Sequence, residues 1–179
     1  MASVLIVGGP GSGKSSVAAE LLRRGQRSID ADYGLARWED PQGTPVEFPP
    51  GPDMRWLRYH RWRWIHERLE QVLQECHHRS AALCGTASNM ADHLPRFDLL
   101  ILLRIDEATM VRRLKDPGRA NDFGRYGATL EWSLDWRPRL EAEMLEAGAR
   151  PVDGQQPLAN VVDDVLRLCT ACSIDLSQN

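Results

Sequence analysis

Short, uninterrupted apolar segments alternate along the chain with longer segments that carry apolar residues at helical spacing. Val4–Val7 is rich in β-branched residues and ends at a glycine, which is typical of a strand buried on both faces. Ala81–Cys84 has the same character, and Phe97–Ile105 contains an unbroken run of leucine and isoleucine. Weaker strand patterns lie at Arg27–Asp30 and near Pro151–Val152. The pattern therefore predicts about five strands.

Helical periodicity fills most of the intervals between these strands. Ser15–Arg24 has this spacing and stops at a glycine, a common residue just past a helix end. A long helix is predicted from Asp53, its N-cap, to Cys76, because one stripe holds Trp62, Ile65, Leu69, Val72, Leu73 and Cys76. Three more helices are predicted at 107–114, 129–147 and Leu158–Cys169. Pro138 is expected to kink or break the second of these.

Strands that alternate with helices predict an α/β fold, with a parallel sheet of about five strands flanked by helices. The length of 179 residues is that of one domain, so we expect a single domain over 1–179. Residues 39–53 contain five prolines and two glycines and are expected to form an ordered loop.

The composition is that of an ordinary globular protein, with 42% hydrophobic and 26% charged residues. The formal net charge is −3, so no global positive field exists to hold a nucleic acid, and any site for anions must be local. The apolar run at the N-terminus is too short for a signal peptide or a membrane span. Four cysteines in a chain of this length do not form a disulfide framework. We therefore expect a cytoplasmic protein with no nucleic-acid or membrane partner, either a monomer or a homodimer.

One motif carries strong chemical information. Gly8–Ser15 reads GGPGSGKS, which fits G-x-x-x-x-G-K-[ST] in full and lies between a predicted strand and a predicted helix. The glycines let backbone N–H groups surround a phosphate, and the helix directs the positive end of its dipole at the same anion. Lys14 is expected to reach the β- and γ-phosphates, and the Ser15 hydroxyl to bind Mg²⁺. The predicted nucleotide-binding residues of this P-loop are Gly9, Pro10, Gly11, Ser12, Gly13, Lys14, Ser15 and Ser16.

Two carboxylates stand where the second predicted strand ends, at Asp30 and Asp32. At positions i and i+2 they point the same way, and this end of a parallel strand lies beside the P-loop. One carboxylate can hold Mg²⁺ through water while the other accepts a proton from an attacking hydroxyl group. The alternative is a pair of solvated aspartates at a strand end.

Four arginines surround the turn at Asp116–Gly118, namely Arg112, Arg113, Arg119 and Arg125. Phosphoryl transfer needs positive charge on the group being transferred, and arginines on a mobile segment supply it once substrate is bound. Arg119 is the candidate for this catalytic contact. Arg113, in the last turn of its helix, is expected to stack on the nucleotide base. A solvated basic loop is the alternative.

Together, the P-loop, the aspartate pair and the arginine-bearing segment resemble the shikimate and gluconate kinase branch of the nucleoside-monophosphate-kinase-like P-loop proteins. Ala82–Ala87 looks like a strand end of gluconate kinases, and Asn121–Gly124 resembles the lid of that branch. Arg137–Glu141 is similar to the shikimate kinase segment whose arginine binds the substrate's carboxylate. The resemblance implies ATP as donor, Mg²⁺ as metal, an arginine-bearing lid at about 115–128 and an acceptor-binding region at about 33–75.

The resemblance also implies roles for individual residues. It assigns Asp30 to the metal, with Ser15, and makes Asp32 the base and a ligand of the acceptor. Gln155 lies in a segment similar to the strand and loop that pass beside the base, so it joins Arg113 as a nucleotide contact.

In this architecture the helix after Asp53 borders the acceptor pocket. Arg55 and Arg58, near its start and facing Arg137, are therefore candidates to bind an anionic acceptor, with a solvated helix face as the alternative. The three tryptophans of this region, Trp56, Trp62 and Trp64, are expected to be core or cover rather than a platform for a base.

The sequence departs from the family's pattern in three places. Asn89 stands near the position of the shikimate kinase glycine triplet, and Asp122 precedes Phe123 where gluconate kinases have a histidine. Residues 39–53 and the tryptophan- and arginine-rich helix after them match neither kinase. The resemblance therefore predicts the reaction class and leaves the acceptor open.

Three functions fit these residues. The first is an ATP-dependent kinase that moves the γ-phosphoryl group of ATP to a hydroxyl group of a small, anionic or sugar-like metabolite. The second is a nucleoside monophosphate kinase, whose acceptor is a phosphate. The third is a nucleotide-dependent ATPase or switch with a protein partner, although the chain has no NKxD-like guanine-binding motif.

Overall fold

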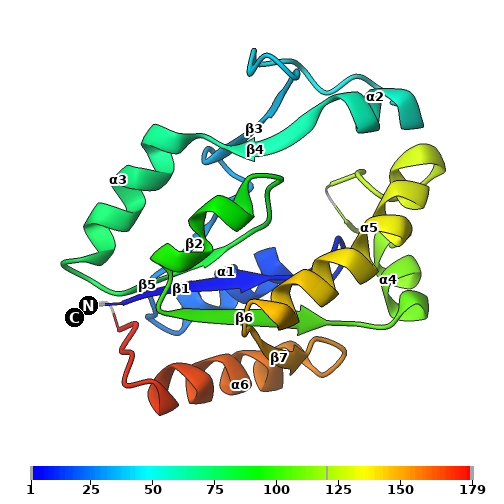
Figure 1. Cartoon of the computed structure of the whole chain (residues 1–179). Helices are drawn as coiled ribbons and strands as arrows, with labels where there is room; N and C mark the ends of the chain where they lie inside the picture. The colour runs from blue at the N-terminus through cyan, green and yellow to red at the C-terminus, as the bar shows by residue number, and fades with distance from the viewer. Residues whose placement is uncertain (1, 120, 178–179) are drawn as a thin grey trace.

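The computed structural model describes residues 2–119 and 121–177. Residue 120, inside the predicted lid, and residues 1, 178 and 179 lie outside the described part of the predicted domain. Five parallel strands form the central sheet in the order β2–β5–β1–β6–β7 (Figure 1). Their bounds are Ser3–Val7 for β1, Ser28–Asp30 for β2, Ala81–Cys84 for β5, Leu99–Arg104 for β6 and Arg150–Asp153 for β7. The predicted parallel sheet is confirmed.

Helices cover both faces of this sheet. On one face lie α1 (Lys14–Arg23) and α6 (Leu158–Ala171), and on the other lie α3 (His66–Cys76) and α5 (Gly127–Glu146). In β1, Val4 and Ile6 pack toward the first pair of helices, whereas Leu5 and Val7 pack toward the second pair. Because successive side chains of a strand point to opposite faces, an apolar run of this kind fills two cores at once.

The region after Asp53 differs from the predicted single helix, which is wrong over its middle part. Asp53 does cap a helix, because its carboxylate accepts a hydrogen bond from the Trp56 backbone N–H at 2.7 Å. That helix, α2, covers only Met54–Tyr59, and His60 takes an extended backbone conformation. Arg61–Trp64 then forms strand β4, antiparallel to β3 (Ala36–Glu39). Its alternation of arginine and tryptophan has the period of a strand and buries Trp64, which is 2% exposed.

The β3–β4 hairpin is fixed by two buried polar groups. Glu39 forms ion pairs with Arg37 at 2.8 Å and with Arg63 at 3.4 Å, one from each strand. Asn89, in the loop after β5, accepts a hydrogen bond from the Trp64 backbone N–H at 3.0 Å and donates one to the Trp64 carbonyl at 3.1 Å. Asn89 therefore ties the hairpin to the central sheet.

Two further elements complete the chain. Helix α4 covers Glu107–Leu114, as predicted, and a 3₁₀ helix that the sequence pattern did not indicate covers Met90–Arg96. Helix α5 continues through Pro138, so the proline does not break it. Its second half stays helical because Leu140 and Met144 are buried against the sheet, and such packing outweighs one lost backbone hydrogen bond.

Candidate active site

The P-loop lies between the end of β1 and the start of α1, at the edge where all five parallel strands end. Gly13, just before Lys14, has a φ of 98°, which side chains rarely tolerate. Gly8 is needed for close approach, since a Cβ there would lie 2.5 Å from the Ser12 Oγ and 2.8 Å from the Leu103 carbonyl oxygen. The glycines therefore permit a loop that no bulkier sequence could form.

Lys14 is folded into this loop. Its Nζ donates hydrogen bonds to the carbonyl oxygens of Gly8 at 2.7 Å and Gly9 at 3.3 Å, and the residue is 9% exposed. Burial lowers the pKa of Lys14, while the nearby carboxylates of Asp32 and Asp30 oppose that shift. The buried Ser12 Oγ has no hydrogen-bond partner among the described residues. An ammonium group, an unpaired buried hydroxyl and the amino end of a helix all suit an anion.

The residues proposed for Mg²⁺ fit that ion by their chemistry. Ser15 and Ser16 are exposed in the first turn of α1, so the Ser15 hydroxyl is available as an oxygen ligand. Asp30 ends β2, and its Oδ1 accepts a hydrogen bond from the Asp32 backbone N–H at 3.0 Å. Hydroxyl and carboxylate oxygens are the ligands that Mg²⁺ prefers.

The Asp32 carboxylate is half-buried near Lys14. Burial raises the pKa of Asp32, the charge of Lys14 lowers it, and that of Asp30 raises it. In addition, the Trp62 indole N–H donates a hydrogen bond to the Asp32 carboxylate. Sequence reasoning missed this contact, because it placed Trp62 on the apolar stripe of a helix. The Arg–Trp alternation of residues 61–64 was the available signal.

Arg113 and Gln155 lie on the other side of the P-loop. The Arg113 guanidinium donates to the Gly154 carbonyl at 2.8 Å and to the Gly11 carbonyl at 3.4 Å. The side-chain oxygen of the exposed Gln155 accepts from the Asp106 backbone N–H at 3.0 Å. The structure thus brings together the two residues predicted to contact the base.

The segment between α4 and α5 contains the predicted catalytic Arg119. Its guanidinium donates to the Phe123 carbonyl at 2.8 Å, and its charge contributes to lowering the pKa of Lys14. Arg125 holds the segment by donating to the Arg119 carbonyl at 2.6 Å. The Phe123 ring lies 5.8 Å from Phe48 and 6.2 Å from Trp38, centroid to centroid. This segment therefore contacts the aromatic side chains of the β3–β4 region.

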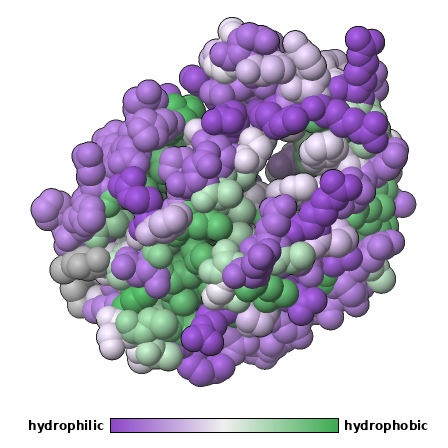
Figure 2. Space-filling model, in the orientation of Figure 1, coloured by the Kyte–Doolittle hydropathy of each residue, from purple (hydrophilic) through white to green (hydrophobic). Residues whose placement is uncertain are grey.

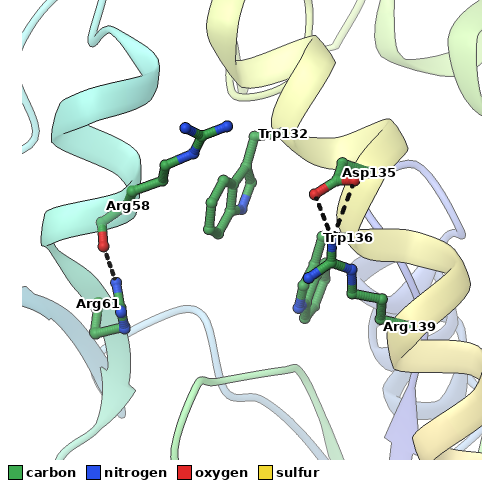
Figure 3. A pocket seen from close by; sticks show the side chains of 6 residues that line it. All are labelled: Arg58, Arg61, Trp132, Asp135, Trp136 and Arg139. Atoms are coloured by element: carbon green, nitrogen blue, oxygen red, sulfur yellow. Dashed lines mark hydrogen bonds and ion pairs between the residues drawn. The ribbon is translucent and has the colours of Figure 1, made fainter.

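A cavity of about 440 Å³ separates α2 and β4 from α5. In the space-filling view the surface is hollowed between the segment around α2 and β4, which is strongly hydrophilic, and α5 (Figure 2). Its lining residues are Arg58, Arg61, Trp132, Asp135, Trp136 and Arg139 (Figure 3). Arg55 is exposed on α2 and is not among these lining residues of the described structure.

Arg137 was predicted to face Arg55 and Arg58, but it is not among the described residues that line this space. Arg139 lines the cavity, whereas the Arg137 guanidinium donates to Glu141 at 2.9 Å and to the Ile105 carbonyl at 3.2 Å. Its stem lies beside the P-loop, since a Cβ on Gly9 would be 3.2 Å from the Arg137 Cγ. Two residues along a helix differ by about 200° in direction, so Arg137 and Arg139 serve different surfaces.

A clustered metal site and a reactive thiol find little support among the described residues. Within 2–119 and 121–177, no group of three or more His, Cys, Asp or Glu side chains is arranged to hold a metal ion. Burial raises the pKa of Cys84, beside β2, to about 12, so this thiol stays protonated. Among the helices described, none has the length and apolar character to cross a membrane.

Comparison with protein families finds a match to a model described as an AAA domain, over residues 4–125. No curated protein matches the chain. Those 122 residues include the P-loop, the aspartate pair and most of the segment between α4 and α5.

Solved structures share the fold. A shikimate kinase from Acinetobacter baumannii, in complex with shikimate, has a TM-score of 0.58 at 16% identity and covers 98% of this chain and 96% of its own. A deoxyadenosine kinase from M. mycoides with bound dATP has a TM-score of 0.54 at 16% identity, covering 94% and 99%. A gluconokinase from Sinorhizobium meliloti 1021 has a TM-score of 0.53 at 21% identity, covering 96% and 94%. The fold is therefore that of P-loop kinases.

Proposed function

The chain belongs to the AAA domain family, and from this premise we propose that it is an ATP-dependent kinase. It transfers the γ-phosphoryl group of ATP to a hydroxyl group of a small, anionic or sugar-like acceptor. One observation carries the proposal: the half-buried Asp32 carboxylate interacts with Lys14, whose ammonium group is folded into the P-loop. This interaction supports Asp32 as a base beside the proposed site for the transferred phosphate.

On the donor side, the residues of the P-loop bind the phosphates of ATP. Lys14 exchanges its bonds to the Gly8 and Gly9 carbonyls for bonds to the β- and γ-phosphates. The Ser12 hydroxyl, buried and without a partner among the described residues, gains an acceptor. Arg113 and Gln155 hold the base at the opposite end of the loop.

Ser15 and Asp30 are the residues that would hold Mg²⁺, Ser15 through its hydroxyl and Asp30 through water. When bound, this ion neutralises charge on the β- and γ-phosphates. Asp30 is close enough to affect Lys14 electrostatically, which supports a shared phosphate site.

Asp32 orients the acceptor hydroxyl and takes its proton. The hydroxyl oxygen forms a new bond to the γ-phosphorus, and the bond from that phosphorus to the β–γ bridging oxygen breaks. ADP leaves with the electron pair of the broken bond. Burial raises the pKa of Asp32, which makes its carboxylate a stronger base than that of a solvated aspartate.

Arg119 supplies positive charge to the transferring group, and we propose that its segment, about 115–128, acts as the lid. Arg137 lies beside Gly9 and is proposed to contact the acceptor or the transferring phosphate from α5. Both guanidinium groups are now bonded to protein oxygens, Arg119 to Phe123 and Arg137 to Glu141, which they would share with a bound anion. The protein works on a small molecule, in the cytoplasm, as a monomer or homodimer.

A nucleoside monophosphate kinase is the second candidate function. The observation that favours it is the cavity beside α5, where arginines and indole rings line the same space. In that case the nucleophile is a phosphate oxygen, which is already ionised at neutral pH, and Asp32 orients the acceptor without removing a proton.

The experiment is acceptor-dependent release of ADP from ATP and Mg²⁺, measured over pools of sugars, hydroxy acids and nucleotides. The proposal predicts slow release alone and much faster release with one class of acceptor, absent in Lys14→Ala. Rapid ADP release that no small molecule changes would instead indicate an ATPase or switch.

A further inference from the structure

We propose that the cavity between α2–β4 and α5 binds a phosphate monoester that carries a ring, and that this compound is the acceptor. The inference rests on the kinase function proposed above and names the class of its second substrate. The six residues that line the cavity combine flat apolar surfaces with excess positive charge.

One wall of the cavity is a single face of α5. Trp132, Asp135, Trp136 and Arg139 stand at helical spacings of three, four and seven, so they share that face. Trp136 is also packed against the sheet, which fixes its ring. In Figure 3 the indoles of Trp132 and Trp136 extend from α5 toward the space between the two elements. Two rings one helical turn apart offer stacking surface to a nucleobase or to the apolar face of a sugar.

The opposite wall contributes charge. Arg58 extends from α2 toward Trp132, and Arg61 follows in β4 (Figure 3). The Arg61 guanidinium donates to the backbone carbonyls of Arg58 and His60, the latter at 3.0 Å. Neither arginine forms an ion pair with a carboxylate within residues 2–119 and 121–177. They are therefore charged groups available to an anion.

The cavity as a whole has a surplus of positive charge. Its only carboxylate among the described lining residues, Asp135, is paired with Arg139 at 3.3 Å. Arg58 and Arg61 remain as two uncompensated guanidinium groups. A phosphate monoester carries a charge of about −1.5 to −2 at neutral pH, and guanidinium groups bind its oxygens in pairs. A singly charged carboxylate would leave part of this positive charge unmatched.

The size of the cavity agrees with such a ligand. Sites for small molecules commonly span roughly 300–1,000 Å³, and this cavity measures about 440 Å³. Its two walls come from α2 and β4 on one side and from α5 on the other, segments that are far apart in the sequence, which is typical of a substrate cleft rather than of a packing defect. Nucleoside monophosphates and sugar phosphates both meet these requirements.

The test measures direct binding in the absence of ATP, by calorimetry and by quenching of tryptophan fluorescence. Four probes separate the parts of the proposal: dAMP, glucose 6-phosphate, adenosine and inorganic phosphate. We expect one of the first two to bind, at least tenfold more tightly than adenosine or inorganic phosphate. Arg58→Gln and Trp132→Leu should each weaken that binding by roughly 10- to 100-fold. Arg58 is exposed and Trp132 is half-buried, and unfolding curves verify that the variants fold.

Two control variants remove a guanidinium group and an aromatic ring outside the cavity. Arg167→Gln removes an exposed guanidinium from α6, and Tyr59→Leu removes an exposed ring from α2 that is not part of the cavity wall. Neither should change the affinity. The inference is overturned if none of the probes binds below millimolar concentration, or if Arg58→Gln and Trp132→Leu bind as the wild type does.

The failure of this inference is distinguishable from the failure of the kinase proposal. If a phosphate monoester binds in the cavity but does not raise ADP release, while Mg-ATP still binds, the cavity is not the acceptor site and the inference is overturned. If Mg-ATP itself does not bind, the kinase proposal fails, whatever the cavity binds. Support requires cavity-dependent binding together with phosphorylation of the bound compound.

Discussion

The indole N–H of Trp62 donates a hydrogen bond to the carboxylate of Asp32. The two residues are joined across elements, since Asp32 follows the edge strand β2 and Trp62 lies in the separate β3–β4 hairpin. The hairpin is anchored in turn, because the Ser88 backbone N–H donates to the Trp62 carbonyl at 2.8 Å. The β3–β4 pair, part of the predicted acceptor-binding region, thus reaches the proposed base through one tryptophan.

Removing this donor should raise the pKa of Asp32. The hydrogen bond stabilises the ionised carboxylate, so Trp62→Phe leaves it harder to ionise. The titration midpoint of the Asp32 carboxyl carbon, followed by NMR, should move to higher pH. The acidic limb of the pH–rate profile for phosphoryl transfer should move in the same direction. Trp56→Phe alters a ring of the same aromatic group without a bond to Asp32 and should leave the midpoint in place. An unmoved midpoint in Trp62→Phe would remove this tryptophan from the account.

Asp32→Asn should reduce phosphoryl transfer by roughly 10²- to 10⁴-fold, as expected for loss of a general base. The affinity for Mg-ATP should change little, because the variant keeps Lys14 and the P-loop intact. Steady-state kinetics with the acceptor found in the ADP-release screen checks the first part, and calorimetry the second. Normal turnover in this variant would show that the base is another residue.

The same substitution should stabilise the folded protein at neutral pH. Burial raises the folded-state pKa of Asp32 above its unfolded value, so the folded state binds this proton more tightly. Stability from this group is complete below the unfolded pKa and is lost as pH rises through the folded pKa. The free energy of unfolding of Asp32→Asn should therefore exceed that of wild type at pH 7, and the difference should shrink toward zero as pH falls. Urea unfolding at several pH values measures it, and a difference that grows on acidification would contradict the assigned direction.

Asn89→Ala should destabilise the fold by about 1–3 kcal/mol, since the buried N–H and C=O of Trp64 lose their side-chain partner. Ser88→Ala is the matched control, because Ser88 is exposed and bonds Trp62 through its backbone. Denaturant unfolding of both variants provides the comparison. Equal stability of the two would mean that Asn89 does not anchor the hairpin.

Local sequence patterns were sufficient for the sheet and for the P-loop. Val4–Val7 is buried on both faces, and so is Leu99–Leu103 apart from the half-buried Leu100, so continuous apolar runs identify these strands. The glycine-rich motif before Lys14 identifies the P-loop directly. The ion pair between Arg63 and Glu39 could not be predicted from the sequence, because Glu39 lies on β3, a strand that pairs with β4 only in the folded chain.

Residues of the cavity illustrate the limit of one-dimensional patterns. Trp132, Trp136 and Arg139 were not among the predicted site residues, although their spacing on one face of α5 was visible. That face becomes a cavity wall only because α2 and β4 stand opposite it. The ambiguity of residues 54–76, where helical and strand periods overlap, hid that arrangement.

The most direct test of the central claim, that the P-loop binds the β- and γ-phosphates of a nucleoside triphosphate through Lys14, is calorimetric titration of Mg-ATP into wild type and Lys14→Ala. The ammonium group of Lys14 is held within 3.3 Å of the Gly8 and Gly9 carbonyls, where a bound phosphate would replace them. We predict measurable binding to wild type and to the control Arg167→Ala, and a loss of at least tenfold in Lys14→Ala. Equal affinity of wild type and Lys14→Ala for ATP, with both proteins folded, would contradict the account.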